Sequence, residues 1–283
     1  LTSIGVSILT KEIFKIKFSE KKNYLIKISY VVVIVFLFIL PLVFPENINW
    51  ISAVDEPPVI FTGGTPFPPT TDWLDTLTWI KMNTPENAVI ASWWDYGYWI
   101  TTLSDRATLI DNATLGSKPI TKMAKMFLSS PEDSWNILKE MNADYVVVFV
   151  AANNIGDVSH DFPLYDVNGG GDESKIYWFS KIAELPVNDY LYPNSVVPTV
   201  NFWKNTMLGK MIPFTPVVYY HPETQENSQI YKNGFVEISV KKIEYDSEND
   251  PVKLVYTSTS FMNDNSGPMI SVLVYEVNKN YIP

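Results

Sequence analysis

The sequence predicts a membrane-anchored protein of the α/β class (mixed α+β), and three observations support this. An uncharged apolar run lies near the N-terminus, short predicted strands alternate with helices in the middle of the chain, and period-two patterns dominate its last part. We therefore expect one N-terminal transmembrane helix (24–46), a helix-rich core domain with a small, mainly parallel sheet (72–212), and a β-rich C-terminal subdomain (213–283).

The predicted transmembrane helix rests on residues 28–44, which are 17 consecutive uncharged residues. A spanning helix needs about 20 apolar residues and tolerates roughly 17–25. Lys27 and Tyr24 can lengthen the run by snorkelling and by interfacial anchoring, which extends the expected helix to 24–46. A cleaved signal peptide is the alternative, and the poor small-residue cleavage site disfavours it.

The charges around this helix give its expected orientation. Residues 1–27 carry six lysines against two glutamates, a net charge of +4. Because positive flanks stay cytoplasmic, segment 1–23 is expected in the cytoplasm and residues 45–283 outside it. The chain starts at Leu1 instead of a methionine, so we expect a fragment or a processed chain.

A segment rich in proline and glycine follows the predicted helix. Five prolines and two glycines in residues 54–71 predict an extended linker and not a helix, and we place this linker at 47–71. The core domain then begins with a predicted helix at 72–83, in which Trp73, Leu77 and Ile80 share one stripe.

The core domain continues with alternating strands and helices. The run 87–92 predicts a buried strand, and Ser130 followed by Pro131 and Asp133 is typical of a helix start. Further helices are expected at 97–103, 118–128, 172–185 and 199–211, and further strands at 107–111, 144–150, 235–240 and 269–277.

The composition excludes several classes of function. The net charge of −10 argues against a nucleic-acid partner, which would need a basic surface. No cysteine is present, so thiolate metal sites and cysteine nucleophiles are excluded. The two histidines, His160 and His221, lie far apart in the sequence, which disfavours a histidine-rich metal site and a Ser-His-Asp relay.

Residues 92–100, SWWDYGYWI, stand at the carboxyl end of a predicted strand, where ligands gather in parallel α/β sheets. The indoles of Trp93 and Trp94 can only donate hydrogen bonds and the carboxylate of Asp95 can only accept them, whereas a hydroxyl does both. These three groups can therefore saturate a Ser or Thr hydroxyl and reject an analogue that lacks it by a factor on the order of 10⁴. Gly97 permits a tight turn. The alternative is aromatic packing at a strand end.

The same word resembles the WWDYG motif of the catalytic subunits of oligosaccharyltransferases, the membrane enzymes of protein N-glycosylation. Further along, GDESKIYWFSKIAE resembles the DxxKxxx(M/I) motif of this family, with Asp172 and Lys175 matched and Phe179 in the place of Met or Ile. The words around 92–100 and the segment FWKNTMLGKM are also similar. The resemblance covers about residues 24–212.

The resemblance implies that this chain recognises the acceptor polypeptide. Trp93, Trp94 and Asp95 would bind the hydroxyl at the +2 position of Asn-x-Ser/Thr, and Lys175, supported by Asp172, would sit beside that pocket. The whole acceptor-binding set comprises Trp93, Trp94, Asp95, Tyr96, Gly97, Asp172, Lys175 and Phe179. Positions 172, 175 and 179 share one helix face. Phe179 would press on the threonine methyl group, and its bulk leaves the preference for Thr over Ser open. Tyr98 would lie near the lipid-linked sugar donor. Taken alone, the Asp172–Lys175 pair is typical of a solvated helix pair.

The resemblance also implies partners that this chain does not contain. The donor would be a lipid-linked (dolichol-type) oligosaccharide, and Mn²⁺ or Mg²⁺ would be held in an upstream multi-spanning region embedded in membrane lipid. We therefore assign no catalytic and no metal-binding residue here, and expect the chain alone to transfer no glycan. The DxxK lysine and the lack of cysteine favour an archaeal source, with the domain outside the plasma membrane; in a eukaryote it would face the ER lumen.

Two other interpretations stay open. The chain could be a membrane-anchored extracellular domain that binds carbohydrate, or a purely structural surface domain. Asn112, in the triplet NAT, is a possible glycosylation site, and a structural role at the end of a predicted strand is equally compatible with its position.

Overall fold

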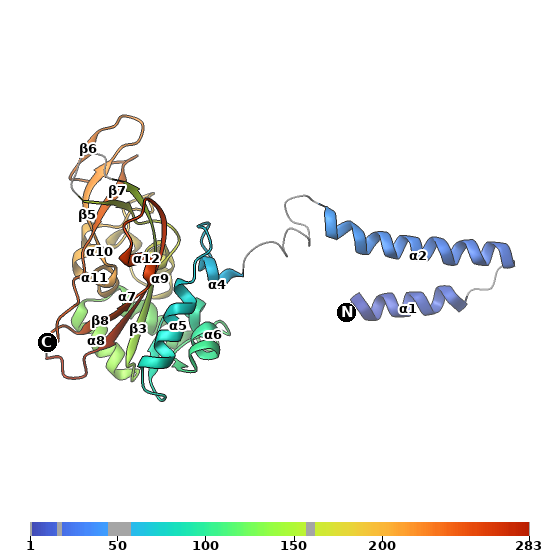
Figure 1. The fold of residues 1–283 in the computed structure, drawn as a ribbon, viewed down its shortest axis with the longest axis horizontal. Coiled ribbons are helices and arrows are strands. Elements are labelled where there is room, and N and C mark those ends of the chain that lie inside the picture. Colours follow the sequence, from blue (N-terminus) through green and yellow to red (C-terminus); the bar gives the residue numbers. More distant parts are fainter. Residues whose placement is uncertain (1, 16–18, 45–57, 157–161, 283) are drawn as a thin grey trace. The chain divides into compact units, whose positions relative to one another are not determined.

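The computed structural model describes residues 2–15, 19–44, 58–156 and 162–282 (Figure 1). Contacts divide the chain into two compact units, Leu1–Pro57 and Pro58–Pro283. The described part of the first unit consists of two helices, and all described strands lie in the second.

The first unit contains α1 (Thr2–Lys15) and α2 (Glu20–Val43). Within α2, residues Lys22–Leu42 are long and apolar enough to cross a membrane, with a mean hydropathy of 2.7 and no part buried, in agreement with the predicted helix 24–46. Pro41 lies in the last turn, where a proline disturbs few helical hydrogen bonds. Helix α1 was not predicted, because its charged and apolar residues show no clear period of 3.6.

The predicted linker 47–71 needs a correction where it is described, while residues 45–57 lie outside the described part. Residues Val59–Thr62 form a short helix, α4, where none was expected. Gly63 and Gly64, both with positive φ, end it. The Thr70 N–H then bonds the Phe61 carbonyl at 2.8 Å, so the segment folds back as a loop on the globular unit.

The globular unit contains several helices between and after its strands. They are α5 (Asp72–Asn83), α6 (Gly97–Trp99), α7 (Ser117–Leu128), α8 (Pro131–Glu140), α9 (Ile176–Ile182), α10 (Val200–Asn205), α11 (Met207–Met211) and α12 (Thr259–Met262). The predicted helix 199–211 is thus two helices, because Thr206 caps a new start by accepting a hydrogen bond from Gly209 N–H. The predicted helix 172–185 begins as a 3₁₀ turn, Asp172–Lys175, and its α-helical part ends at Ile182.

The described strands form one sheet. They are β1 (Val89–Ala91), β2 (Ala107–Thr108), β3 (Tyr145–Gly156), β4 (Leu164–Asp166), β5 (Phe214–Tyr220), β6 (Asn227–Ser228), β7 (Val236–Lys241), β8 (Val252–Thr257) and β9 (Gly267–Val277). The strand order is β2-β1-β3-β4-β7-β5-β6, while β9 pairs with β3 and with β8.

The sheet is parallel only where β1 pairs with β2 and β3, and all its other pairings are antiparallel. The expected parallel core is therefore present but small. Strand β9 lies along β3 from Tyr145↔Glu276 to Asn154↔Gly267, so the β-rich residues 213–283 continue the sheet of the core domain. Their last strand joins the core because β3 is buried on both faces and needs a partner along its whole length.

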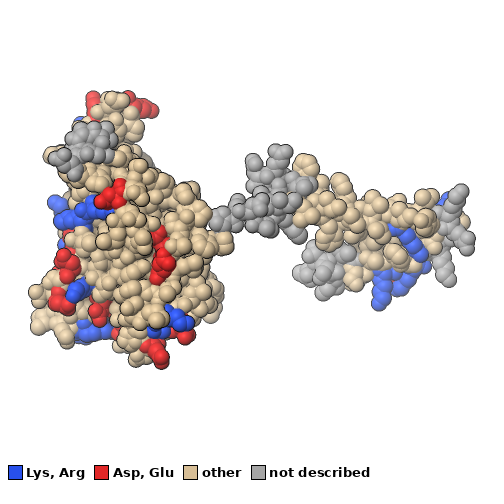
Figure 2. All heavy atoms as spheres, viewed as in Figure 1, with Lys and Arg blue, Asp and Glu red and all other residues tan. Residues whose placement is uncertain are grey.

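Helices cover the sheet around β3, which is the centre of the core. The side chains of Val146–Ala152 are fully buried, as are Leu77 and Ile80 on the stripe predicted for α5. On the globular unit, the face shown in Figure 2 carries acidic and basic side chains interspersed, without a continuous basic surface. The core thus holds β1 and β3 rigidly, and the loops at their carboxyl ends start from a fixed frame.

Candidate functional site

The segment 92–100, predicted to recognise a hydroxyl group, begins directly after β1, at the carboxyl end of a parallel strand. Trp93 is extended, and Trp94–Tyr96 form a 3₁₀ turn that leads into α6. A Cβ atom on Gly97 would lie 2.5 Å from Cα of Asp111 and 2.6 Å from the carbonyl oxygen of Ile110. Glycine is therefore required here by the close approach of α6 to the chain after β2.

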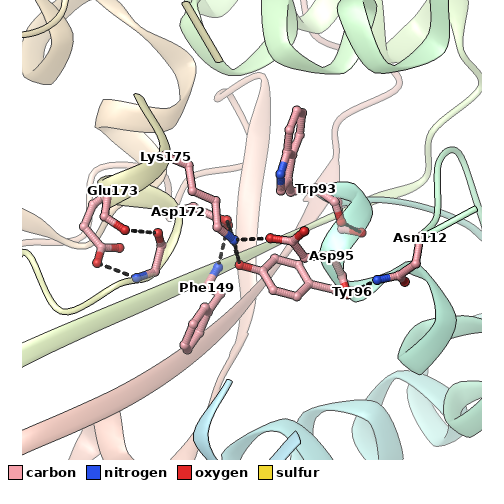
Figure 3. Close-up of polar contacts among 11 residues, drawn as sticks. Trp93, Asp95, Tyr96, Asn112, Phe149, Asp172, Glu173 and Lys175 are labelled. Atoms are coloured by element: carbon pink, nitrogen blue, oxygen red, sulfur yellow. Dashed lines mark hydrogen bonds and ion pairs between the residues drawn. The ribbon is translucent and has the colours of Figure 1, made fainter. Parts of the chain in front are cut away.

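The two predicted motifs meet through a polar network (Figure 3). The hydroxyl of Tyr96 donates to Oδ1 of Asp172 at 2.8 Å. Nζ of Lys175 lies 2.9 Å from Oδ2 of Asp95 and 3.3 Å from Oδ1 of Asp172, and it also donates to the Tyr96 hydroxyl. The structure therefore brings together four of the residues that the sequence singled out, from segments 76 positions apart.

The charged side chains of this network differ in exposure, from Asp172 in the core to Asp95 near the surface. The Asp172 side chain is fully buried, that of Lys175 is 18% exposed and that of Asp95 is 32% exposed. Burial raises the pKa of Asp172, against the opposing effects of Lys175 and of the hydrogen bond from Phe149 N–H at 2.9 Å. Burial, assisted by Asp172, also raises the pKa of Tyr96 well above its ordinary value, so this phenol stays a donor.

The two predicted indoles lie beside this network. Trp93 is 3% exposed, Trp94 is half-buried, and their ring centroids are 6.1 Å apart. Within the described residues, neither indole N–H has a hydrogen-bond partner. Neither nitrogen is among the buried unpaired atoms of the described residues, so water can reach both N–H groups and a ligand could replace it.

Phe179 occupies a different place from the one predicted. Its ring is fully buried, stacked on Phe127 at 5.1 Å and edge-on to Trp93 at 4.7 Å. The ring therefore supports Trp93 from behind, and no part of it faces an open surface where a threonine methyl group could contact it. The prediction of a direct acceptor contact by Phe179 finds no support in this geometry.

A cavity of about 430 Å³ opens at the network. Asp95, Tyr96, Tyr98 and Lys175 line one part of it, and the remainder is lined by Val59, Gly63, Gly64, Trp99, Asn112 and Gly170. The loop that ends α4 thus forms part of the wall, which sequence reasoning missed because its glycines and prolines were interpreted as a linker.

Tyr98 and Asn112 stand at the edge of this cavity. The ring of Tyr98 is 48% exposed. The Asn112 side chain donates to the Asp95 carbonyl at 3.0 Å and accepts from Tyr98 N–H at 3.2 Å. The nitrogen and the oxygen of this amide thus fasten the segment after β2 to the 3₁₀ turn Trp94–Tyr96 and to α6. This supports the structural interpretation of Asn112, while its glycosylation stays a prediction.

Sequence reasoning also missed Glu173, which was treated as a variable position of the second motif. It is 2% exposed, and its Oε1 accepts from Gly171 N–H at 2.8 Å. Burial raises its pKa to about 8. Its only sequence signal was the adjacent acid Asp172. The described residues contain no group of three or more His, Asp and Glu side chains that could hold a metal ion.

Comparisons with known proteins relate this chain to one family. Residues 86–161 match the STT3/PglB/AglB core domain. The chain is 34% identical over 154 residues to the STT3 subunit of dolichyl-diphosphooligosaccharide–protein glycosyltransferase of Saccharomyces cerevisiae, which covers 53% of this chain and 20% of that protein. It is 39% identical over 77 residues to the Dictyostelium discoideum subunit, covering 27% of this chain and 11% of that one.

Among solved structures, the C-terminal globular domain of an oligosaccharyltransferase from Archaeoglobus fulgidus is similar at 21% identity and a TM-score of 0.39. The match covers 75% of this chain and 99% of that domain. The chain spans a fifth or less of the length of the two curated relatives.

Proposed function

We propose that this chain is the C-terminal part of an oligosaccharyltransferase catalytic subunit of the STT3/PglB/AglB family, and that it recognises the Asn-x-Ser/Thr acceptor during protein N-glycosylation. The family match over 86–161 includes the whole word Trp93–Gly97, and the yeast relative supports the same assignment. The enzyme as a whole would be a glycosyltransferase that moves a lipid-linked oligosaccharide onto asparagine.

The observation that carries the proposal is the ion pair between Asp95 and Lys175, next in sequence to two indoles whose N–H groups have no partner among the described residues. A hydroxyl group needs an acceptor for its hydrogen and donors for its lone pairs. Asp95, partly exposed at the cavity, supplies the acceptor, and the N–H groups of Trp93 and Trp94 supply the donors. The proposal therefore requires that Trp93 and Trp94, which do not line the cavity, reach the same hydroxyl group as Asp95.

The buried part of the network keeps that acceptor in place. Lys175 compensates the charge of Asp95, and Asp172 and Tyr96 hold Lys175 in turn. A side chain fixed by several partners loses little freedom when a ligand arrives, which favours binding. In this proposal Asp172, Lys175 and Tyr96 are positioning residues, and Tyr98 at the cavity edge would lie near the lipid-linked donor.

The rest of the enzyme belongs to the same proposal. The donor would be a dolichol-type lipid-linked oligosaccharide, and Mn²⁺ or Mg²⁺ would be bound by residues upstream of this chain. Helix α2 would anchor the chain in membrane lipid, with the globular unit on the outer face. An archaeal plasma membrane stays the proposed setting; the two curated relatives described above are eukaryotic and correspond to the alternative setting, the ER lumen.

The test uses Asp95→Asn in the full-length enzyme, with Asp105→Asn as the matched control. Asp105 lies in the same region, is exposed, and has a left-handed backbone (φ 57) that asparagine tolerates. Transfer to a fluorescent Asn-Ala-Thr peptide should fall by at least about 100-fold in Asp95→Asn, while the control stays near wild type. The unfolding transition should be retained.

The other outcomes of this test would refute the proposal or support one of the other two interpretations. Unchanged transfer by Asp95→Asn would refute acceptor recognition. Loss of folding in Asp95→Asn would favour the purely structural interpretation. Binding of free glycans at Trp94 and Asp95, with or without an acceptor sequence, would favour the carbohydrate-binding surface domain.

A further inference from the structure

A second cavity of the described globular unit does not belong to the recognition site. It has a volume of about 940 Å³ and lies where α9, the loop after the 3₁₀ turn Val187–Asp189, and strands β4 and β7 come together. Its size is at the upper end of the about 300–1,000 Å³ that is typical of small-molecule sites. Helix α9 begins directly after Lys175 and lines this second cavity. The two cavities share no lining residue.

Aromatic rings supply the apolar part of this cavity. Tyr177, on α9, is 44% exposed. Tyr192 and Tyr231 stack at a centroid distance of 4.2 Å and an interplanar angle of 15°, and they also line the cavity. Rings held at a cavity wall offer flat apolar faces with polar tips, which suits ligands that are apolar on one side and polar at the rim.

The polar part contains a buried carboxyl group with an unused atom. Glu237 is 6% exposed, and its Oε2 accepts from the indole N–H of Trp203 at 2.9 Å. Its Oε1 is buried and has no hydrogen-bond partner among the described residues. An unpaired buried oxygen is unfavourable, so a ligand group that pairs it gains affinity.

The charge state of this carboxyl group argues for a neutral ligand. Burial raises the pKa of Glu237 to about 8 and the nearby Asp166 adds to this effect, against the opposing contacts with Trp203 and Ser239. Burial also raises the pKa of Asp166. A protonated Glu237 both donates and accepts, as a hydroxyl does, whereas a cationic ligand would need a carboxylate. Lys181, which lines the same cavity, further disfavours a cation.

We propose that this cavity binds neutral hexose units of an oligosaccharide. The apolar C–H faces of the sugar rings pack on Tyr177 and on the Tyr192–Tyr231 pair, and sugar hydroxyls bond Glu237 and Asp166. The volume of about 940 Å³ accommodates a short oligosaccharide. This inference does not rest on acceptor recognition at Asp95, because no residue of the ion-pair network lines the cavity.

The experiment measures binding of neutral trisaccharides to the whole 283-residue chain. The chain is placed in phosphatidylcholine nanodiscs, because sugar-headgroup detergents would compete. Mannotriose, maltotriose and chitotriose are titrated with saturation-transfer NMR as the readout. At least one should bind with a Kd of about 1 mM or tighter. Tyr177→Ala should weaken this binding by about 3- to 10-fold.

Two further variants sharpen the result. Trp178→Ala is the control, because this indole is 62% exposed on the same helix, touches Tyr177 edge-on and does not line the cavity. It should leave the Kd within about twofold of wild type. Glu237→Met keeps a similar length but has neither an O–H donor nor an oxygen acceptor, and it should weaken binding by about threefold or more.

Two sources of the sugar are compared in the same assay. A glycopeptide that carries the trisaccharide on the Asn of Asn-x-Thr is set against the free trisaccharide. Tighter binding of the glycopeptide supports retention of a glycosylated product, and equal binding supports a glycan that is not linked to the acceptor. The proposal is overturned if none of the trisaccharides binds, if Tyr177→Ala binds like wild type, or if a lysine-rich peptide binds in their place.

Discussion

Removing the lysine at the centre of the polar network should destabilise the globular unit by an amount that depends on pH. In Lys175→Met, Asp172 loses its ion pair but keeps the hydrogen bonds from Phe149 N–H and the Tyr96 hydroxyl. Breaking a buried ion pair costs about 3–5 kcal/mol when the remaining charge has no other partner. Because two hydrogen bonds remain and Lys175 is 18% exposed, we expect about 2–3 kcal/mol at pH 7.

The sign of the pH dependence follows from Asp172. Its pKa is raised on folding, so the stability that this group contributes is fully present below its ordinary value of 3.8 and is lost as the pH rises through the folded value. Lys175 lowers the folded pKa of Asp172. Removing Lys175 therefore raises this pKa further and increases the stability that is lost near pH 7. The deficit of Lys175→Met should therefore shrink to below about 1 kcal/mol as the pH falls toward 4.

Urea unfolding followed by tryptophan fluorescence measures this deficit. All but one of the nine tryptophans lie in residues 58–283, so the signal reports the globular unit. Lys204→Met is the control, because Lys204 is exposed on α10 without an ion pair among the described residues, and it should change stability by less than about 0.5 kcal/mol at either pH. A deficit that is the same at pH 7 and pH 4, or below about 0.5 kcal/mol at pH 7, would refute the reasoning.

Four further predictions use the same or simpler assays. Gly97→Ala should cost about 2 kcal/mol or more in urea unfolding, because its Cβ meets the backbone of Asp111 at 2.5 Å; a neutral result contradicts this. Glu173→Gln should match wild type near pH 5 and exceed it by about 2 kcal/mol at pH 9, since the raised pKa of Glu173, about 8, means that stability is lost as the pH rises from 4.5 through that value; equal stability at pH 9 argues against it. Asn112→Ala should cost about 1–2 kcal/mol through two lost hydrogen bonds, and less than about 0.5 kcal/mol would count against the structural role. The 283-residue chain alone should transfer no glycan to a sequon peptide, and any glycopeptide seen by mass spectrometry overturns this expectation.

The elements that the sequence predicted well are those whose local signal and tertiary role agree. Helix α8 begins where Ser130 caps it, and the Ser130 side chain accepts from Asp133 N–H as the pattern indicated. Strand β3 is buried on both faces, and its unbroken apolar run predicted this burial. Its length, twelve residues, was underestimated because Asn153 and Asn154 hide its polar end.

The missed elements depend on contacts between distant parts of the chain. Strand β4 has three residues and pairs with β7 at Tyr165↔Ser239, a contact that no local pattern reveals. Strand β5 contains Pro216, and a proline inside a run argues against a strand. The structure accommodates it at a shift in the register between β5 and β7, which the sequence does not reveal. The loop after α4 belongs to the cavity wall only because Gly63 packs on Phe149, far along the chain.

The candidate site divides in the same way, because two of the four residues 93–96 pack in the core and two do not. Trp93 and Tyr96 are almost fully buried, while Trp94 and Asp95 between them stay partly exposed. A 3₁₀ turn produces this division, because it points successive side chains about 120° apart instead of alternating them across a strand. The buried pair anchors the turn in the core, and of the exposed pair Asp95 lines the cavity while Trp94 does not. The packing of Trp93 and Tyr96 thus fixes the backbone that carries Asp95. Lys175 links the buried and the exposed parts of the site, because it contacts both the buried Tyr96 and the partly exposed Asp95.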